Sequence, residues 1–113
     1  MVNIRKLTED YIAAFDSRDL DQIAELLAEG FELTDLDVMA LTPKKKVLEY
    51  IKELFDTHES LSFEAHLVLV DRDVSVIHFS LTLDSLVFDG VDIINWQEQK
   101  MTHMKAYLTP RRE

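Results

Sequence analysis

Residues 61–83 read LSFEAHLVLV-DRD-VSVIHFSLTL, and this stretch decides the fold. Apolar side chains recur at every second position in both halves, which is the pattern of half-buried β-strands. The polar residues 71–73 form a short connection between the halves. We expect two neighbouring strands, each with one apolar face; those faces hold Leu61, Phe63, Ala65, Leu67 and Leu69 in the first, and Ile77, Phe79, Leu81 and Leu83 in the second.

The strand pattern continues after residue 83. Asp84-Ser85 is a modest break, and Asp89-Gly90 is typical of a turn or bulge. Strands are predicted from Val91 to Gln97 and from Met101 to Leu108, and the second of these has Thr102, Met104, Ala106 and Leu108 on one face. Another strand is predicted earlier in the chain, near Phe31 to Val38. The sequence thus provides at least five strands.

Helices are predicted mainly in the first half of the chain. Asn3 is a suitable N-cap for a helix that runs to about Ser17. Asp19 with Gln22 three residues later forms a capping box at the start of a second, shorter helix. Gly30 fits the left-handed position that ends such a helix.

A third helix begins after Thr42-Pro43, which read as N-cap and first helical residue, and ends near Thr57. The predicted order is therefore α-α-β-α-β-β-β-β. Early helices and late strands favour an α+β domain with a mostly antiparallel sheet. We expect one domain over residues 1–113, in which a curved sheet wraps over three helices and leaves a cone-shaped cavity.

The composition excludes several classes of function. The formal net charge is −10, which argues against DNA, RNA and anionic membranes as partners. The chain has no cysteine, so thiol nucleophiles, disulfides and thiolate metal sites are excluded. It shows neither a signal-peptide core nor an apolar run long enough to span a membrane. We expect a soluble, cytoplasmic protein.

Two aspartates stand at inward positions of predicted strands. Asp35 alternates in phase with Phe31 and Leu33, and Asp92 with Ile94 and Trp96. A carboxyl group in an apolar layer is costly unless it is hydrogen-bonded or protonated. These two aspartates are therefore candidate functional residues. Because a bulge would shift the register, Asp37 remains an alternative to Asp35.

Three segments resemble a known family: YIAAF at 11–15, DLDQI at 19–23 and LLAEGF at 26–31. Together with GVDIINW at 90–96 and KMTHMKAYL at 100–108, they resemble the NTF2-like superfamily, in particular its SnoaL-like branch and the bacterial ketosteroid isomerases. The resemblance covers nearly the whole chain. It implies the cone-shaped, cystatin-like α+β barrel of that superfamily, whose members include isomerases, cyclases and non-enzymes.

The resemblance also implies roles for individual residues. Tyr11 matches the tyrosine on the first helix of ketosteroid isomerases, and Asp35 matches their general base. Asp92 matches the second oxyanion donor of ketosteroid isomerases. That donor is a carboxylic acid kept neutral by its apolar site, and ketosteroid isomerase is the standard example of such an acid. The chemistry implied is proton transfer next to a carbonyl, catalysed by Asp35 as base with Tyr11 and Asp92 as donors, without metal or organic cofactor.

The expected ligand is a small hydrophobic molecule, held by an apolar wall of Phe31, Leu33, Phe79, Ile94, Trp96, Met104 and Leu108. The four histidines have no metal-ligand spacing. An inward His66 or His78 beside Asp35 would favour dehydratase-like or cyclase-like acid–base chemistry instead. The alternative to an enzyme is a non-catalytic binding module or a homodimer formed through the sheet, with His103, Lys105 and Tyr107 at the contact.

Overall fold

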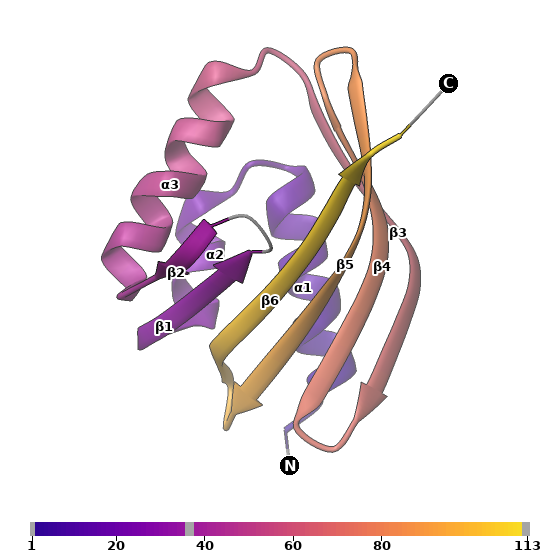
Figure 1. Ribbon diagram of the computed structural model, residues 1–113. Coiled ribbons are helices and arrows are strands. Elements are labelled where there is room, and N and C mark those ends of the chain that lie inside the picture. Colours follow the sequence, from indigo (N-terminus) through magenta and orange to yellow (C-terminus); the bar gives the residue numbers. More distant parts are fainter. Residues whose placement is uncertain (1, 36–37, 112–113) are drawn as a thin grey trace.

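The computed structural model describes residues 2–35 and 38–111 and has the predicted α+β architecture. Three helices pack against the concave face of one curved, six-stranded sheet (Figure 1). The elements are α1 (Ile4–Asp16), α2 (Leu20–Leu26), β1 (Leu27–Asp35), β2 (Val38–Leu41), α3 (Lys44–Thr57), β3 (Leu61–Asp71), β4 (Val74–Leu83), β5 (Leu86–Gln97) and β6 (Lys100–Pro110). Within the described ranges, no helix is long and apolar enough to cross a membrane.

The strands lie in the order β2-β1-β6-β5-β4-β3. All neighbours are antiparallel except β1 and β6, which run parallel. The pair β3 and β4 is the hairpin that residues 61–83 predicted, closed by the turn at 72–73. The parallel pair brings the first strand of the chain beside the last, so residues from opposite ends of the sequence share the concave face.

The predicted helix starts are confirmed for the first two helices. The Asn3 side chain accepts a hydrogen bond from the Lys6 amide at 3.0 Å, and the Asp19 side chain accepts one from the Gln22 amide at 3.1 Å. These caps satisfy amides that have no partner within the helix. Between the helices, Arg18 adopts a φ of 58°.

The Arg18 side chain fastens the corner between α1 and α2 to the end of α3. Its guanidinium donates hydrogen bonds to the carbonyl oxygens of Phe55, His58 and Glu59 at 2.7–2.8 Å. The last carbonyls of a helix have no intrahelical partner, so a cation that binds them is favourable there. This contact fixes α3, which forms one wall of the interior.

Two of the predicted turns are wrong. Gly30 lies inside β1 without a positive φ, because α2 ends earlier, at Leu26, and the strand runs on through the glycine, where its pairing with β6 is irregular. Asp89-Gly90 lies inside β5, and the chain turns instead at Asp84, whose φ is 55°. At Gly90 an added Cβ would lie 2.7 Å from the Phe79 ring, so the glycine serves close packing rather than a turn.

The third helix begins one residue later than expected. Pro43 is its N-cap and makes no side-chain capping bond, while the Thr42 hydroxyl donates to the Phe31 carbonyl at 2.9 Å. The threonine therefore ties the start of α3 to β1 instead of capping the helix.

The predicted face of β3 is wrong beyond Ala65. A register shift between Ala65 and Leu67 turns the strand by one position, so Leu67 and Leu69 are 51% and 53% exposed on the convex face. A bulge in one strand reverses the side-chain phase that follows it. A similar shift opposite Asn95 and Trp96 displaces Thr102 from the inward face predicted for it.

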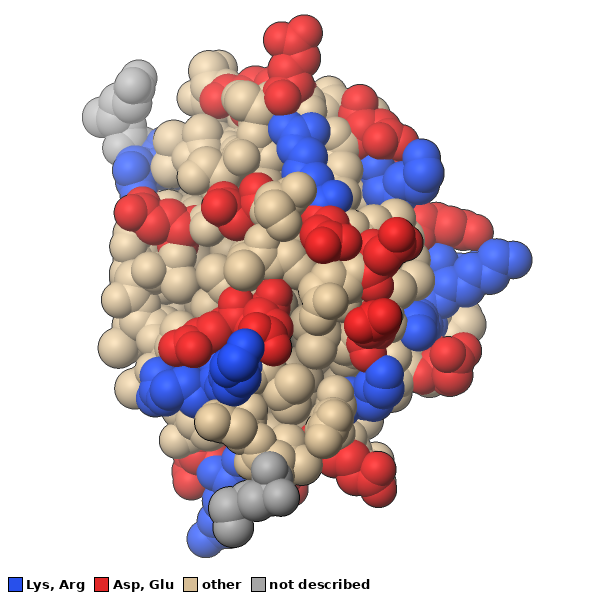
Figure 2. All heavy atoms as spheres, turned by 180° about the vertical axis from the view of Figure 1, so that it is seen from behind, with Lys and Arg blue, Asp and Glu red and all other residues tan. Residues whose placement is uncertain are grey.

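Charge is distributed as the composition suggests. Figure 2 shows acidic side chains spread over the back of the molecule, with lysine and arginine side chains among them rather than gathered into one continuous basic surface. Such a surface does not favour binding of a nucleic-acid backbone.

Candidate functional site

The sheet register brings the two aspartates into one row. Asp35 on β1 and Asp92 on β5 are both Cα partners of Ala106 on β6, which lies between them. Residues directly opposite one another on neighbouring strands point to the same face. Two strand spacings separate the Cα atoms of the two acids by about 10 Å. Ala106 is the smallest apolar side chain, so it leaves open space between the two carboxyl groups.

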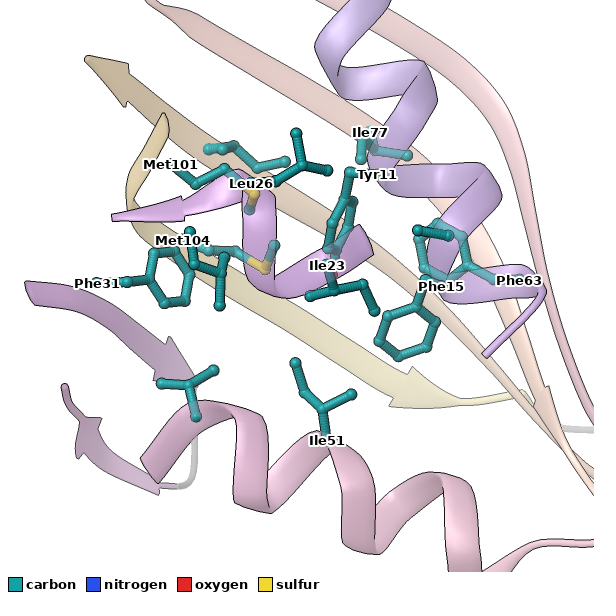
Figure 3. Packing of buried hydrophobic residues seen from close by; sticks show 14 of the residues in the cluster. Tyr11, Phe15, Ile23, Leu26, Phe31, Ile51, Phe63, Ile77, Met101 and Met104 are labelled. Carbon is teal, nitrogen blue, oxygen red and sulfur yellow. The ribbon is translucent and has the colours of Figure 1, made fainter. Parts of the chain in front are cut away.

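This row forms part of the wall of an interior cavity of about 370 Å³. Its lining is mostly aliphatic and aromatic, and the polar side chains in it are Tyr11, Asp35, Tyr50 and Asp92. Figure 3 shows part of the buried hydrophobic cluster around this cavity, in which Tyr11 of α1, Ile51 of α3 and Met104 of the sheet are also lining residues. A concave apolar site with a few converging polar groups is the usual form of a small-molecule site.

The Asp92 side chain lies in the interior, against the cavity. It is 4% exposed, and within residues 2–35 and 38–111 it makes no hydrogen bond. Burial raises the pKa of Asp92 to about 8, and the nearby charge of Asp35 contributes to the rise. At neutral pH the carboxyl is therefore mostly protonated and can donate a hydrogen bond into the cavity.

Tyr11 reaches the same cavity from the middle of α1. Its ring contacts Phe15 and Phe63, with centroids 6.0 and 6.4 Å away. Within the described part of the chain, its buried hydroxyl makes no hydrogen bond. Burial, and then the negative charge of Asp92, raise the pKa of Tyr11 well above its ordinary value. The phenol therefore keeps its proton and is a second donor.

Asp35 is partly buried at the end of β1, where it faces the cavity in phase with Phe31 and Leu33. The pairing of β1 with β2 has a register shift between Leu33 and Asp35, but the pairing with β6 continues through Asp35 in register. The alternative residue, Asp37, lies outside the described residues. The structure thus brings together Tyr11, Asp35 and Asp92, the three residues selected from the sequence.

Five of the seven predicted wall residues line the cavity, namely Phe31, Leu33, Phe79, Met104 and Leu108. Ile94 and Trp96 do not. They are buried on the same face as Asp92, but at the end of the sheet that α1 covers. There the Trp96 indole donates to the Ser75 hydroxyl at 2.9 Å, and Thr8 of α1 donates to the same oxygen at 2.8 Å. The alternation correctly predicted that Ile94 and Trp96 face inward. It does not indicate which part of the inward face is covered by a helix.

Thirteen of the 21 residues that line the cavity were not predicted from the sequence, and Tyr50 and Ala106 are the two that bear on its polar groups. Tyr50 of α3 was not among the apolar positions of its helix, although it stands three residues after the buried Val47. Ala106 was placed on the inward face, but its position between the two aspartates follows from strand pairing, which the pattern does not encode. Its only signal was the small side chain itself.

The histidines lie away from this cavity. His66 and His78 are exposed on the convex face, with ring centroids 5.3 Å apart, so the interpretation that depended on an inward histidine loses its support. Within residues 2–35 and 38–111, no three histidine, aspartate or glutamate side chains form a possible metal site.

A separate polar network on the convex face involves Ser80. Its hydroxyl donates to Asp89 at 3.0 Å and lies 2.7 Å from the His66 Nε2 atom. Arg111 binds both Asp89 and Ser80, and hydrogen bonds from Arg111 and then Ser80 lower the pKa of Asp89 to about 2. The serine proton is directed to a carboxylate rather than to the histidine, so this arrangement does not activate a nucleophile.

Comparison with known proteins identifies the family of this chain. The family model for the SnoaL-like domain matches residues 8–104. The chain belongs to the SnoaL-like family. It therefore lies within the NTF2-like superfamily, as the resemblance implied. No curated protein matches the sequence.

Solved structures share the fold of this SnoaL-like chain at low sequence identity. A candidate ketosteroid isomerase from Kribbella flavida superimposes with a TM-score of 0.87 at 18% identity, covering 97% of this chain and 80% of the other. A candidate SnoaL-like polyketide cyclase from Shewanella denitrificans gives 0.82 at 11% identity, with 94% and 90% covered. An NTF2-like protein of unknown function from Cytophaga hutchinsonii gives 0.84 at 9%, with 96% and 92% covered. At these identities, the likeness shows the fold alone.

Proposed function

We propose that this SnoaL-like domain binds a small, neutral, mostly apolar carbonyl compound and transfers a proton at the carbon next to the carbonyl. The reaction is of the ketosteroid isomerase-like or polyketide cyclase-like kind. The observation that carries the proposal is the convergence of the partly buried Asp35 side chain, the protonated Asp92 carboxyl and the Tyr11 phenol on one apolar cavity.

Each of the three groups has a role that its surroundings support. Asp35 removes the proton from the carbon atom. Asp92 and Tyr11 donate hydrogen bonds to the oxygen on which negative charge develops. A donor of this kind contributes about 3–4 kcal/mol to stabilisation of the transition state. These side chains supply a base and two acids, so the proposed reaction requires no metal or organic cofactor.

The cavity favours a compact, uncharged ligand. Its volume lies near the lower end of the range for small-molecule sites. No lysine, arginine or histidine is among the described residues that line it, whereas two aspartates are. A carboxylate or phosphate group would therefore enter without a counter-charge and beside acidic groups, which is unfavourable.

The test is hydrogen–deuterium exchange at the α-carbon of 2-tetralone, a bicyclic neutral ketone, followed by NMR in D₂O. We expect exchange above the buffer rate that is lost in Asp35→Asn and retained in Asp71→Asn, a control at the exposed end of β3. The exchange rate should also fall as the pH rises through about 8, because Asp92 then loses the proton that it donates. Exchange that is unchanged in Asp35→Asn would refute the assigned base.

The convex face of the sheet supports a second proposal, the non-catalytic one: contact with another copy of the chain. Leu67 and Leu69 are exposed there on β3, and Tyr107 and Lys105 on β6. Exposed apolar side chains grouped on one face are a common feature of protein interfaces. Sedimentation velocity should give a dimer for the unmodified chain and a monomer for Leu67→Lys; a monomer at all concentrations would refute this proposal.

A further inference from the structure

Beyond the row that holds the two aspartates, the wall of the cavity continues along β5 and β6. The strand register pairs Gly90 with Leu108 and then Phe88 with Pro110. Each pair lies two residues further along both strands, so the Phe88–Pro110 pair lies about 14 Å from the aspartate row. Leu108, Phe88 and Pro110 all line the cavity, so this outer part is continuous with the space beside the acids.

The cavity opens at this outer end. Along β5, Asp92 is buried and Phe88 is partly buried, whereas Leu86, two residues before Phe88, is 62% exposed. Burial decreases in the same direction along β6, from the buried Ala106 to the exposed Pro110. The C-terminal ends of α3 and β6 and the turn between β4 and β5 lie together at this end of the molecule (Figure 1).

The opposite end of the cavity is closed. Phe31 and Met101 line it there, and neither side chain is more than 2% exposed. The face of α3 that lines the cavity shows the same gradient, because Val47 is buried near the start of the helix and Leu54 is partly buried near its end. A ligand therefore enters past Phe88, and any part of it that does not fit beside the acids extends back towards the opening.

The outer part of the cavity is apolar and has an aromatic wall. The Phe79 ring lies against Gly90, where an added Cβ would be 2.7 Å from the ring, and it stacks on Phe63 with the ring centroids 4.6 Å apart. Apart from the two aspartates, no described residue that lines the cavity is charged. Such a surface favours each methylene group that a ligand buries against it.

The end of β6 is tied down from the convex face. The Arg111 amide donates a hydrogen bond to the Val87 carbonyl at 2.8 Å, and the Arg111 guanidinium forms an ion pair with Asp89 at 2.6 Å. Both contacts join β6 to β5, so Pro110 is fixed opposite Phe88 and does not fray with the chain end.

We propose that the substrate carries an extended apolar tail, and that Phe88 and Pro110 determine how much of this tail contributes to binding. The proposal rests on the function proposed above, which places the carbonyl oxygen of the substrate at Asp92 and Tyr11. From there the tail runs past Leu108 to the opening. An extended carbon chain advances about 1.2 Å per bond, so about eleven carbons span the distance of about 14 Å.

The test is the binding of straight-chain methyl ketones, from 2-pentanone to 2-pentadecanone, measured from the free ketone in the headspace over the protein solution by gas chromatography. In the unmodified protein we expect affinity to rise about fourfold per methylene until the tail has about eleven carbons, and then to level off. A longer tail projects into solvent and buries no further apolar surface. Affinity that rises through the whole series, or that does not depend on tail length, would overturn the proposal.

Substitution of Phe88 locates the end of the tail. In Phe88→Ala the affinity should level off near the Leu108 position, at about six carbons, while ketones with shorter tails bind as before. The matched control is Leu86→Ala, which removes an exposed apolar side chain further along β5 and should leave the series unchanged. If Phe88→Ala weakens short and long ketones equally, the role of Phe88 is structural and the proposal fails.

A second variant fills the outer part of the cavity. In Leu108→Phe, tails longer than about six carbons should add no affinity, because the larger ring occupies the path to the opening. This variant decides the question even if Phe88→Ala does not fold. A series that Leu108→Phe leaves unchanged would show that the tail does not pass this position, which would overturn the proposal.

Binding and proton transfer are measured separately. If affinity levels off as expected but the unmodified protein does not exchange the α-hydrogens of 2-tetralone, the proposed reaction fails and the selection by tail length stands. If exchange occurs and affinity does not depend on tail length, the proposed reaction stands and the selection fails.

Discussion

Replacing Asp92 with asparagine should stabilise the fold while removing a group from the proposed site. The Asp92 carboxyl is buried, and within the described ranges it makes no hydrogen bond. Its pKa is raised to about 8 in the folded protein, whereas an aspartate in an unfolded chain titrates near about 4. Asparagine has nearly the same shape and never ionises, so Asp92→Asn removes the cost of keeping a carboxyl neutral.

The magnitude follows from the two pKa values. Between pH 4 and pH 8 the unfolded chain releases a proton that folded Asp92 retains, so stability falls by about 1.4 kcal/mol per pH unit. The cost therefore reaches about 2 kcal/mol at pH 5.5 and about 4 kcal/mol at pH 7. It levels off above pH 8, because folded Asp92 is then ionised as well. We expect Asp92→Asn to exceed the unmodified protein in stability by these amounts.

Urea unfolding at pH 5.5, 7 and 8.5 checks the prediction. The stability difference between Asp92→Asn and the unmodified protein should widen from about 2 kcal/mol at pH 5.5 to about 4 kcal/mol at pH 7, with a smaller further rise of about 1 kcal/mol at pH 8.5. Asp71→Asn, at the exposed end of β3, is the control and should show no such dependence. A difference that is the same at all three pH values would refute the reasoning, because it would mean that Asp92 is ionised or protonated to the same extent in both states.

Three further predictions test the packing and the site. Gly90→Ala should lower stability by about 1–3 kcal/mol in urea unfolding, because its Cβ has no space, whereas Gly30→Ala, where nothing lies within 4 Å, should not. Arg18→Gln should lower the free energy of unfolding in urea by about 2 kcal/mol, because the hydrogen bonds to three carbonyl oxygens are lost. Arg72 has a similar positive φ but is exposed, so Arg72→Gln should leave that free energy unchanged. Ala106→Leu should fill the space between the two acids and weaken binding of 2-naphthol, an aromatic analogue of the enol of 2-tetralone, at least about tenfold by fluorescence titration; unchanged affinity would show that the ligand lies elsewhere.

Local signals predicted most of the fold because they act over a few residues. The caps at Asn3 and Asp19 lie where the pattern placed them, since a cap depends on the next three residues alone. The turns predicted at the glycines are wrong because the conformation there depends on neighbouring strands and not on the local sequence. Gly30 and Gly90 are residues typical of turns, but both lie inside strands, and Gly90 pairs with Phe79 on one side and Leu108 on the other. The register shift after Ala65 has no local signal either, so the exposed side of β3 could not be predicted.

The sequence predicted which way the candidate residues face, but not how they lie relative to one another. Alternation alone showed that Asp35 and Asp92 point inward, and the cavity contains both. That they share a row depends on β1 lying parallel to β6, a contact between segments about seventy residues apart in the sequence. The same limit explains Trp96, which faces inward as predicted, yet is bound to Ser75 beneath α1 rather than exposed to the cavity.

The position of Ala106 between Asp35 and Asp92 explains how the fold can hold Asp92 buried on the same face as a second acid. If Asp35 and Asp92 were direct neighbours, repulsion between two carboxylates would be strong, and one proton would be shared between them. With one strand between them, the Cα atoms lie about 10 Å apart, and each acid can hold a separate protonation state. Burial then protonates Asp92, whereas Asp35, at the end of β1, is only partly buried. The proposed base and the proposed acid are thus the same residue type, separated by one strand and by a difference in burial, and the stability that Asp92→Asn should recover measures what this arrangement costs the fold.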